Sequence, residues 1–135
     1  MVRIEGMNGG FIRAEDERRL LQDGMTRFNL SLDEANGAML ATVNDQKLVL
    51  QRVADEGTRE FLNVQASRNR QRKLSRKDFK QAVEMYRAKA RQRVSEEEAK
   101  RRVKCLMLEE GITAKRDGWI IRTRRWFNSI PEQIA

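Results

Sequence analysis

A helix-start pattern that occurs three times is the feature of this sequence that most constrains its fold. Each copy has an apolar residue, then a serine, then an acidic residue three positions later; the serines are Ser31, Ser75 and Ser95. The serine hydroxyl can accept the backbone N–H three residues on, and the acidic side chain can accept the serine N–H. The residues that follow the three serines do not match one another, so we interpret the pattern as a capping device and not as a sequence repeat.

Apolar residues at helical spacing give the predicted helices their lengths. Phe79, Val83 and Tyr86 lie on one face behind the second serine, which is typical of an amphipathic helix. Gly111 follows the apolar stripe behind the third serine, where a left-handed C-cap is expected. The sequence predicts helices over about 14–28, 31–44, 75–92 and 95–110.

The segment 45–73 has a weaker pattern. Leu48-Val49-Leu50 is a short apolar run that periodicity cannot assign to a helix or a strand. We expect a helical segment that breaks at Gly57, then a further helix over 58–72. The basic run at 68–73 would be either a solvated helix end or an anion-binding surface.

After the last of these helices the sequence changes to β-prone runs. Residues 112–116 and 119–123 are joined by Asp117-Gly118, a dipeptide typical of a tight hairpin turn. This predicts a β-hairpin as the only sheet. The expected fold is therefore mainly α: a compact bundle of about five helices with one C-terminal β-hairpin.

Length and charge indicate how the chain is organised. A chain of 135 residues with 39% hydrophobic residues has the size and apolar content of one compact domain. Residues 1–60 carry 8 Lys and Arg against 11 Asp and Glu, whereas residues 61–135 carry 20 against 9. We expect a single domain over 1–135, with an acidic helical scaffold over 1–60 and a basic part of helices and hairpin over 61–135.

Missing residue types exclude several kinds of chemistry. Histidine is absent, which removes the commonest general base and zinc ligand and excludes Ser-His and Cys-His hydrolases. Cys105 is the single cysteine, in agreement with a reducing compartment. No run approaches the roughly 18 apolar residues of a membrane span, and the N-terminus does not resemble a signal peptide. We expect a cytoplasmic protein that is not an enzyme, with no catalytic residue, cofactor, metal, membrane contact or small-molecule substrate. An enzyme that uses Asp, Glu, Lys or Tyr86 is an alternative for which the sequence indicates no pocket.

The candidate binding residues are cations and aromatic residues of the basic part. Lys100, Arg101 and Lys104 lie opposite the apolar stripe on a projection of the helix over 95–110. In and after the hairpin, cations alternate with indoles at Lys115, Arg116, Trp119, Arg122, Arg124, Arg125 and Trp126. Arginine can bind phosphate bidentately, and an exposed indole can stack on a base. Alternatively, both tryptophans cover the core while the arginines remain in water.

The order of elements over about 75–125 resembles the C-terminal part of a winged helix-turn-helix domain. The matching residues are Leu106 to Gly111 at the end of a recognition helix, Ile112 at the start of the wing, and Asp117-Gly118 at the wing tip. The resemblance implies a helix against the DNA major groove and a wing against phosphate. The helical remainder is loosely similar in architecture to the TerB-like bundles of tellurite resistance.

These patterns lead to two hypotheses about function. The first is a protein that binds nucleic acid, DNA or RNA, as a small regulator or as a component of a nucleic-acid-handling complex. The second is a small helical adaptor or inhibitor that docks on an acidic protein surface. The helix over 95–110 begins with Glu96-Glu97-Glu98, whose carboxylates would repel a phosphate backbone, so the hairpin supports the first hypothesis better than the helix does.

Overall fold

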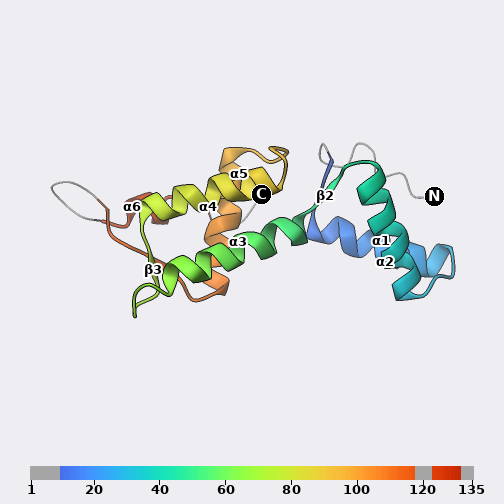
Figure 1. The fold of residues 1–135 in the computed structure, drawn as a ribbon, viewed down its shortest axis with the longest axis horizontal. Coiled ribbons are helices and arrows are strands. Elements are labelled where there is room, and N and C mark those ends of the chain that lie inside the picture. The colour runs from blue at the N-terminus through green and yellow to red at the C-terminus, as the bar shows by residue number, and fades with distance from the viewer. Residues whose placement is uncertain (1–9, 118–122, 132–135) are drawn as a thin grey trace. The chain divides into compact units, whose positions relative to one another are not determined.

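The computed structural model describes residues 10–117 and 123–131 of the chain, which Figure 1 shows as a ribbon. Helices dominate these residues and the named strands among them are two residues long, so the fold is mainly α, as predicted. The contacts of the chain divide it into unit 1, residues 1–53, and unit 2, residues 54–135. Each unit contains buried apolar residues and a pair of strands of its own.

Unit 1 is a helical hairpin whose ends are joined by short parallel strands. Its elements are β1 (Phe11–Ile12), α1 (Ala14–Arg27), α2 (Leu32–Asp45) and β2 (Val49–Leu50). Phe11 pairs with Val49, and Ile12 pairs with Leu50. A buried apolar cluster is formed by Ile12, Leu20, Met39 and Leu50. The run Leu48-Val49-Leu50 thus provides a strand, and Leu48 packs against the cluster.

Local chemistry at two positions determines how α1 and α2 meet. Ser31 precedes α2 and forms a capping box: its hydroxyl accepts the Glu34 N–H at 3.1 Å, and the Glu34 carboxylate accepts the Ser31 N–H at 3.1 Å. Gly24 lies in the last half of α1, where an added Cβ would be 3.2 Å from the Cβ of Ala35. The missing side chain therefore lets the two helices pack closely.

Unit 2 contains a second helical hairpin of the same kind. Its elements are α3 (Gln51–Ala66), which begins in the last residues of unit 1, β3 (Lys73–Leu74), α4 (Arg76–Lys89), α5 (Glu96–Glu109), β4 (Thr113–Ala114) and α6 (Arg125–Asn128). Lys73 pairs with Thr113, and Leu74 pairs with Ala114, in parallel. The fully buried side chains include Leu62, Leu74, Tyr86, Val103, Leu106, Met107 and Ile112.

The two helical hairpins share one order of elements: strand, helix, helix, parallel strand. The helices α1, α2, α4 and α5 each have 14 residues, and Ser31 and Ser95 occupy the same place before the second helix of each hairpin. The sequences themselves do not repeat. Similar capping and similar apolar spacing therefore produce the same local architecture twice.

The predicted serine caps are confirmed at all three positions, and the full capping box with the reciprocal bond from the acidic side chain is confirmed at Ser31. Ser75 precedes α4 and accepts the Asp78 N–H, and Ser95 precedes α5 and accepts the Glu98 N–H, both at 3.1 Å. Gly111 follows α5 with a φ of +68°, and the N–H of Ile112 donates to the carbonyl of Met107 at 2.8 Å, as in a Schellman motif. Both ends of α5 are therefore closed by the residues that the sequence indicated.

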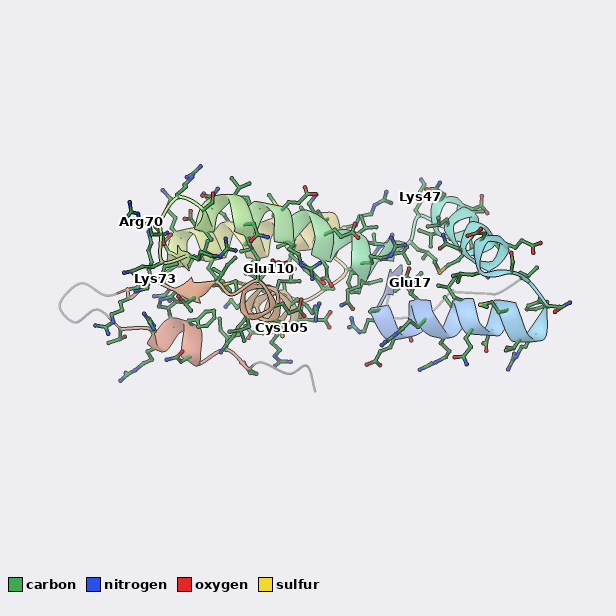
Figure 2. All side chains as sticks on the ribbon, turned by 90° about the horizontal axis from the view of Figure 1, so that it is seen from below. Glu17, Lys47, Arg70, Lys73, Cys105 and Glu110 are labelled. Carbon is green, nitrogen blue, oxygen red and sulfur yellow. The ribbon has the colours of Figure 1, made fainter. Side chains whose placement is uncertain are left out.

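The predicted break at Gly57 is wrong, because α3 continues through this position to Ala66. Glycine in a helix costs roughly 1 kcal/mol relative to alanine. Ala54, Thr58 and Leu62 are fully buried around it, and this packing outweighs the local preference. Since α3 ends at Ala66, the basic run at 68–73 lies in the loop before β3 and in its first residue, where Figure 2 labels Arg70 and Lys73.

The prediction that a β-hairpin forms the only sheet is also wrong. The N–H of Thr113 donates to the carbonyl of Arg72 at 3.0 Å, and the N–H of Lys115 donates to the carbonyl of Leu74 at 2.8 Å. Residues 113–115 therefore bond to β3 and to the residue before it. Burial of Ile112 fixes this pairing. Asp117 and Thr123 form an antiparallel bridge with reciprocal N–H···O bonds of 2.7 and 2.9 Å. The rest of the predicted turn and second strand, residues 118–122, lies outside the described residues.

Candidate functional site

The positive charge of the chain belongs to unit 2. Unit 1 carries 7 Lys and Arg against 8 Asp and Glu, whereas unit 2 carries 21 against 12. The boundary between the units falls a few residues before the one that the charge distribution predicted. Unit 1 still carries slightly more acidic than basic residues, and unit 2 carries an excess of basic residues. A binding surface for an anion is therefore sought in unit 2.

A groove of about 240 Å³ opens in unit 2, and we call it the α4–α6 groove. It is lined by Arg76, Phe79, Lys80, Glu97, Lys100, Trp126, Ser129, Ile130 and Pro131. Three of these side chains are cationic, one is a carboxylate and two are aromatic. The groove therefore combines a net positive charge with an aromatic wall.

Most side chains that line the groove come from the first turns of α4 and α5, two crossing helices that each begin after a capping serine. Arg76, Phe79 and Lys80 have the i, i+3, i+4 spacing that gathers side chains on one face of α4. Glu97 and Lys100 have the same kind of spacing in the first turns of α5. Figure 2 views α5 end-on beside its labelled Cys105, whereas α4 runs across that view, so the two helices cross and both starts reach the groove.

Trp126 is held rigidly in the aromatic wall. Its ring centroid lies 5.3 Å from that of Phe79 in a tilted arrangement and 5.6 Å from that of Phe127 in an edge-to-face arrangement. The indole N–H donates to the carbonyl of Lys115 at 3.1 Å. Trp126 is half-buried, whereas Phe79 and Phe127 are buried. The indole therefore both covers the core and lines the groove, which joins the two interpretations of this residue.

Lys104 does not face outward, and the prediction that it is available to a partner is wrong. Its side chain is buried at 4% exposure, and its ammonium group donates to the carbonyls of Phe127 at 3.1 Å and Ile130 at 2.7 Å. The Nζ atom also lies 4.7 Å from the centroid of the Phe127 ring. A helical projection cannot show that the last part of the chain folds over this position.

Lys100 and Arg101, predicted beside Lys104, are half-buried. Lys100 lines the groove, and its Nζ atom is 3.7 Å from Glu96 Oε1 and 3.8 Å from Glu97 Oε1. Both distances are long for an ion pair, so Lys100 remains accessible to a stronger anionic partner.

The remaining predicted residues come from the segment after β4. Those that are exposed are Lys115, Arg116 and Arg125. Arg124 is half-buried, and Trp119 and Arg122 lie outside the described residues. The predicted set did not include Arg76 and Lys80, which the groove adds; their spacing from Phe79 and their position just after Ser75 are the signals that could have identified them.

A second charged cluster in unit 2 is buried. Arg102 Nη2 donates to Asp55 Oδ2 at 2.8 Å, and both side chains are largely shielded from solvent. Tyr86 is fully buried beside them, and its burial, together with the Asp55 carboxylate, raises the pKa of the phenol above its usual value. The phenol therefore stays protonated at neutral pH, and the cluster stabilises the packing of α3, α4 and α5.

Comparison of the chain with protein-family models, with curated proteins and with solved structures gives no match. Within residues 10–117 and 123–131, no group of three or more acidic or cysteine side chains is placed to hold a metal ion. No helix in the same part of the chain has the length and apolar character to cross a membrane.

Proposed function

We propose that this protein binds nucleic acid through unit 2, as a small regulator or a component of a nucleic-acid-handling complex, and has no catalytic activity of its own. The observation that supports the proposal is the excess of 21 basic over 12 acidic residues in unit 2, against near balance in unit 1. Binding to phosphates releases condensed counterions, which favours association of a cationic surface with nucleic acid most strongly at low salt.

The exposed cations of unit 2 support this proposal because the ion pairs they form within the chain lie at the surface and are weak. Arg76 Nη1 is 3.1 Å from Asp117 Oδ2, but both side chains are about half exposed, and such surface pairs contribute only about 0–1 kcal/mol. Lys80 and Arg125 are exposed near the groove. A phosphate can therefore compete for these side chains without disrupting the core.

From the winged-helix resemblance we retain the wing as a contact with phosphate, and not the start of the recognition helix. Helices α4 and α5 come before a segment in which Asp117 bridges Thr123, an order of elements compatible with a wing. The first turn of α5 contains Glu96, Glu97 and Glu98, which disfavour contact with phosphates. We therefore expect the cations of the groove and those at 115–125 to contact the nucleic acid, while the carboxylates in the first turn of α5 oppose this contact.

The test is the salt dependence of binding to labelled single-stranded and duplex DNA and RNA. We expect affinity to fall steeply with salt, and Arg116→Gln and Arg125→Gln each to reduce the slope of log K against log salt by about one. Arg18→Gln, at an exposed position of α1 in unit 1, is the matched control and should leave the slope unchanged. Lack of binding to every one of these probes at about 50 mM salt would eliminate the proposal.

A second candidate function is docking on an acidic protein surface, which the cations of unit 2 complement in charge and to which exposed apolar side chains add contact area. Phe28 and Leu32, at the α1–α2 turn, are each 55% exposed, and Leu108 on α5 is 45% exposed. Apolar side chains of this size at the surface are typical of protein contacts when they gather. Co-purification of one defined protein, unchanged by nuclease, together with absence of nucleic-acid binding, would favour this function over the first.

A further inference from the structure

We infer that the α4–α6 groove holds one unpaired nucleotide of a nucleic-acid strand, with its base against Trp126 and its phosphate on Lys80, Lys100 and Arg76. The inference rests on the proposed function and adds to it the form of the ligand: single-stranded nucleic acid is preferred over duplex. Three features of the groove support this ligand: its size, its charges and the packing of its aromatic wall.

The volume of the groove indicates a ligand that extends beyond it. Pockets that enclose a small molecule have volumes of roughly 300–1,000 Å³, whereas this groove has about 240 Å³. It therefore suits one residue of a longer chain. A base in a duplex is stacked inside the helix and cannot reach a side wall, whereas an unpaired base can be turned out and stacked on an aromatic ring.

The groove lining contains three cations that provide partners for a phosphate. Lys80 is exposed, and the ion pairs that Lys100 makes with Glu96 and Glu97 are both long. Arg76 can form two parallel hydrogen bonds to a phosphate, which are shorter and stronger than its exposed pair with Asp117. Glu97, a carboxylate among the described lining residues, opposes the phosphate, and its removal should strengthen binding.

The aromatic wall is already in place for a base. Trp126 is fixed by its hydrogen bond to Lys115 and by the rings of Phe79 and Phe127, so little side-chain freedom is lost when a base stacks on it. Trp126 is half-buried and lines the groove, so part of the indole is accessible from the groove. Stacking on a rigid ring of this kind tolerates any base, so no strong sequence preference is expected.

The first experiment measures ligand form on the unmodified chain. A twelve-nucleotide thymidine strand and a duplex of equal length are compared at the same salt concentration. We expect the single strand to bind about tenfold more tightly, the effect of one stacked base. In a Trp119→Phe variant, Trp126 is the remaining tryptophan, and its fluorescence should be quenched by the single strand and not by a poly-glutamate peptide of equal charge.

The second experiment uses matched substitutions on the two helices that form the groove. Lys80→Gln should weaken binding of the single strand about tenfold, whereas Lys77→Gln, at an exposed position of α4 outside the lining, should have a clearly smaller effect. Glu97→Gln should strengthen binding more than Glu96→Gln does, because both acids pair with Lys100 and only Glu97 lines the groove.

The outcomes separate this inference from the proposed function. Salt-dependent binding with equal affinity for single strand and duplex, or without quenching of Trp126, would overturn the groove assignment and leave the proposed function intact. Equal effects of Lys80→Gln and Lys77→Gln, or equal quenching by poly-glutamate, would also overturn it. Absence of binding to any nucleic acid would remove both.

Discussion

The ammonium group of Lys104 donates to two carbonyl oxygens, those of Phe127 and Ile130, and lies over the ring of Phe127. A charged group that leaves water loses hydration free energy, and only close partners can offset this loss. Here the partners belong to α6 and to the residues just after it. The side chain therefore ties the end of the described chain to α5.

Replacing Lys104 with methionine should destabilise unit 2 by about 2 kcal/mol, because two carbonyl acceptors lose a charged donor in a buried place. Urea unfolding, followed by circular dichroism, measures the change in the free energy of unfolding. Lys100→Met, one turn earlier on α5, should change it by less than about 0.5 kcal/mol. Equal effects of the two substitutions would contradict the assigned role of Lys104.

Glu34 gives the capping box of α2 a dependence on pH. The backbone N–H of Ser31, and then its hydroxyl, lower the pKa of this carboxyl group below its ordinary value of 4.5. A group whose pKa is lowered by folding stabilises the folded state above its unfolded pKa, and this contribution is lost as pH falls through the folded value. The ionised box is therefore complete at neutral pH and weakens in acid.

In Glu34→Gln, the melting temperature should fall less between neutral and acid pH than it does in the unmodified chain, because the amide does not titrate. Thermal melting monitored by circular dichroism at a series of pH values checks this. Asp33→Asn, which changes an acid of the same turn outside the box, is the control. A steeper loss in Glu34→Gln than in the unmodified chain would show that the box does not stabilise α2 through its charge.

At the scale of elements, glycine substitutions should have opposite signs in α2 and after α5. Gly37 lies within α2 with open space around an added Cβ, so Gly37→Ala should stabilise the fold by about 0.5–1 kcal/mol. Gly111 has a φ of +68° in the Schellman motif, so Gly111→Ala should cost about 1 kcal/mol. Urea midpoints measured on the two variants test the pair, and a shift of both in one direction would contradict it.

The same elements show what the sequence can predict. Helices α1, α2, α4 and α5 were predicted to within a few residues, because caps and apolar spacing are local signals. The pairing of Lys73 with Thr113 was not predicted, since it joins positions far apart in the chain and depends on packing. The burial of Lys104 was missed for the same reason. Of the candidate site, the basic character of unit 2 was predicted, whereas the contribution of Arg76 and Lys80 needed the crossing of α4 and α5.

At the scale of the whole molecule, unit 1 is close to neutral and unit 2 is strongly basic. If unit 2 carries the binding surface, a bound strand should slow hydrogen exchange of backbone amides there and leave α1 and α2 unchanged, because a ligand stabilises the region it contacts. Hydrogen exchange measured by mass spectrometry, with and without a single-stranded oligonucleotide, tests this. Protection confined to residues 14–45 would contradict the assignment of binding to unit 2.

The parallel pairing of β1 with β2, and of β3 with β4, affects which segments a gene for such a chain can gain or lose during evolution. Because paired strands run in the same direction, the chain leaves each helical hairpin heading the way it entered. A hairpin of this type can be deleted or copied in a gene without reversing the path of the remaining polypeptide. Insertion or loss of a whole hairpin is therefore a change in length that leaves the direction of the flanking chain unchanged.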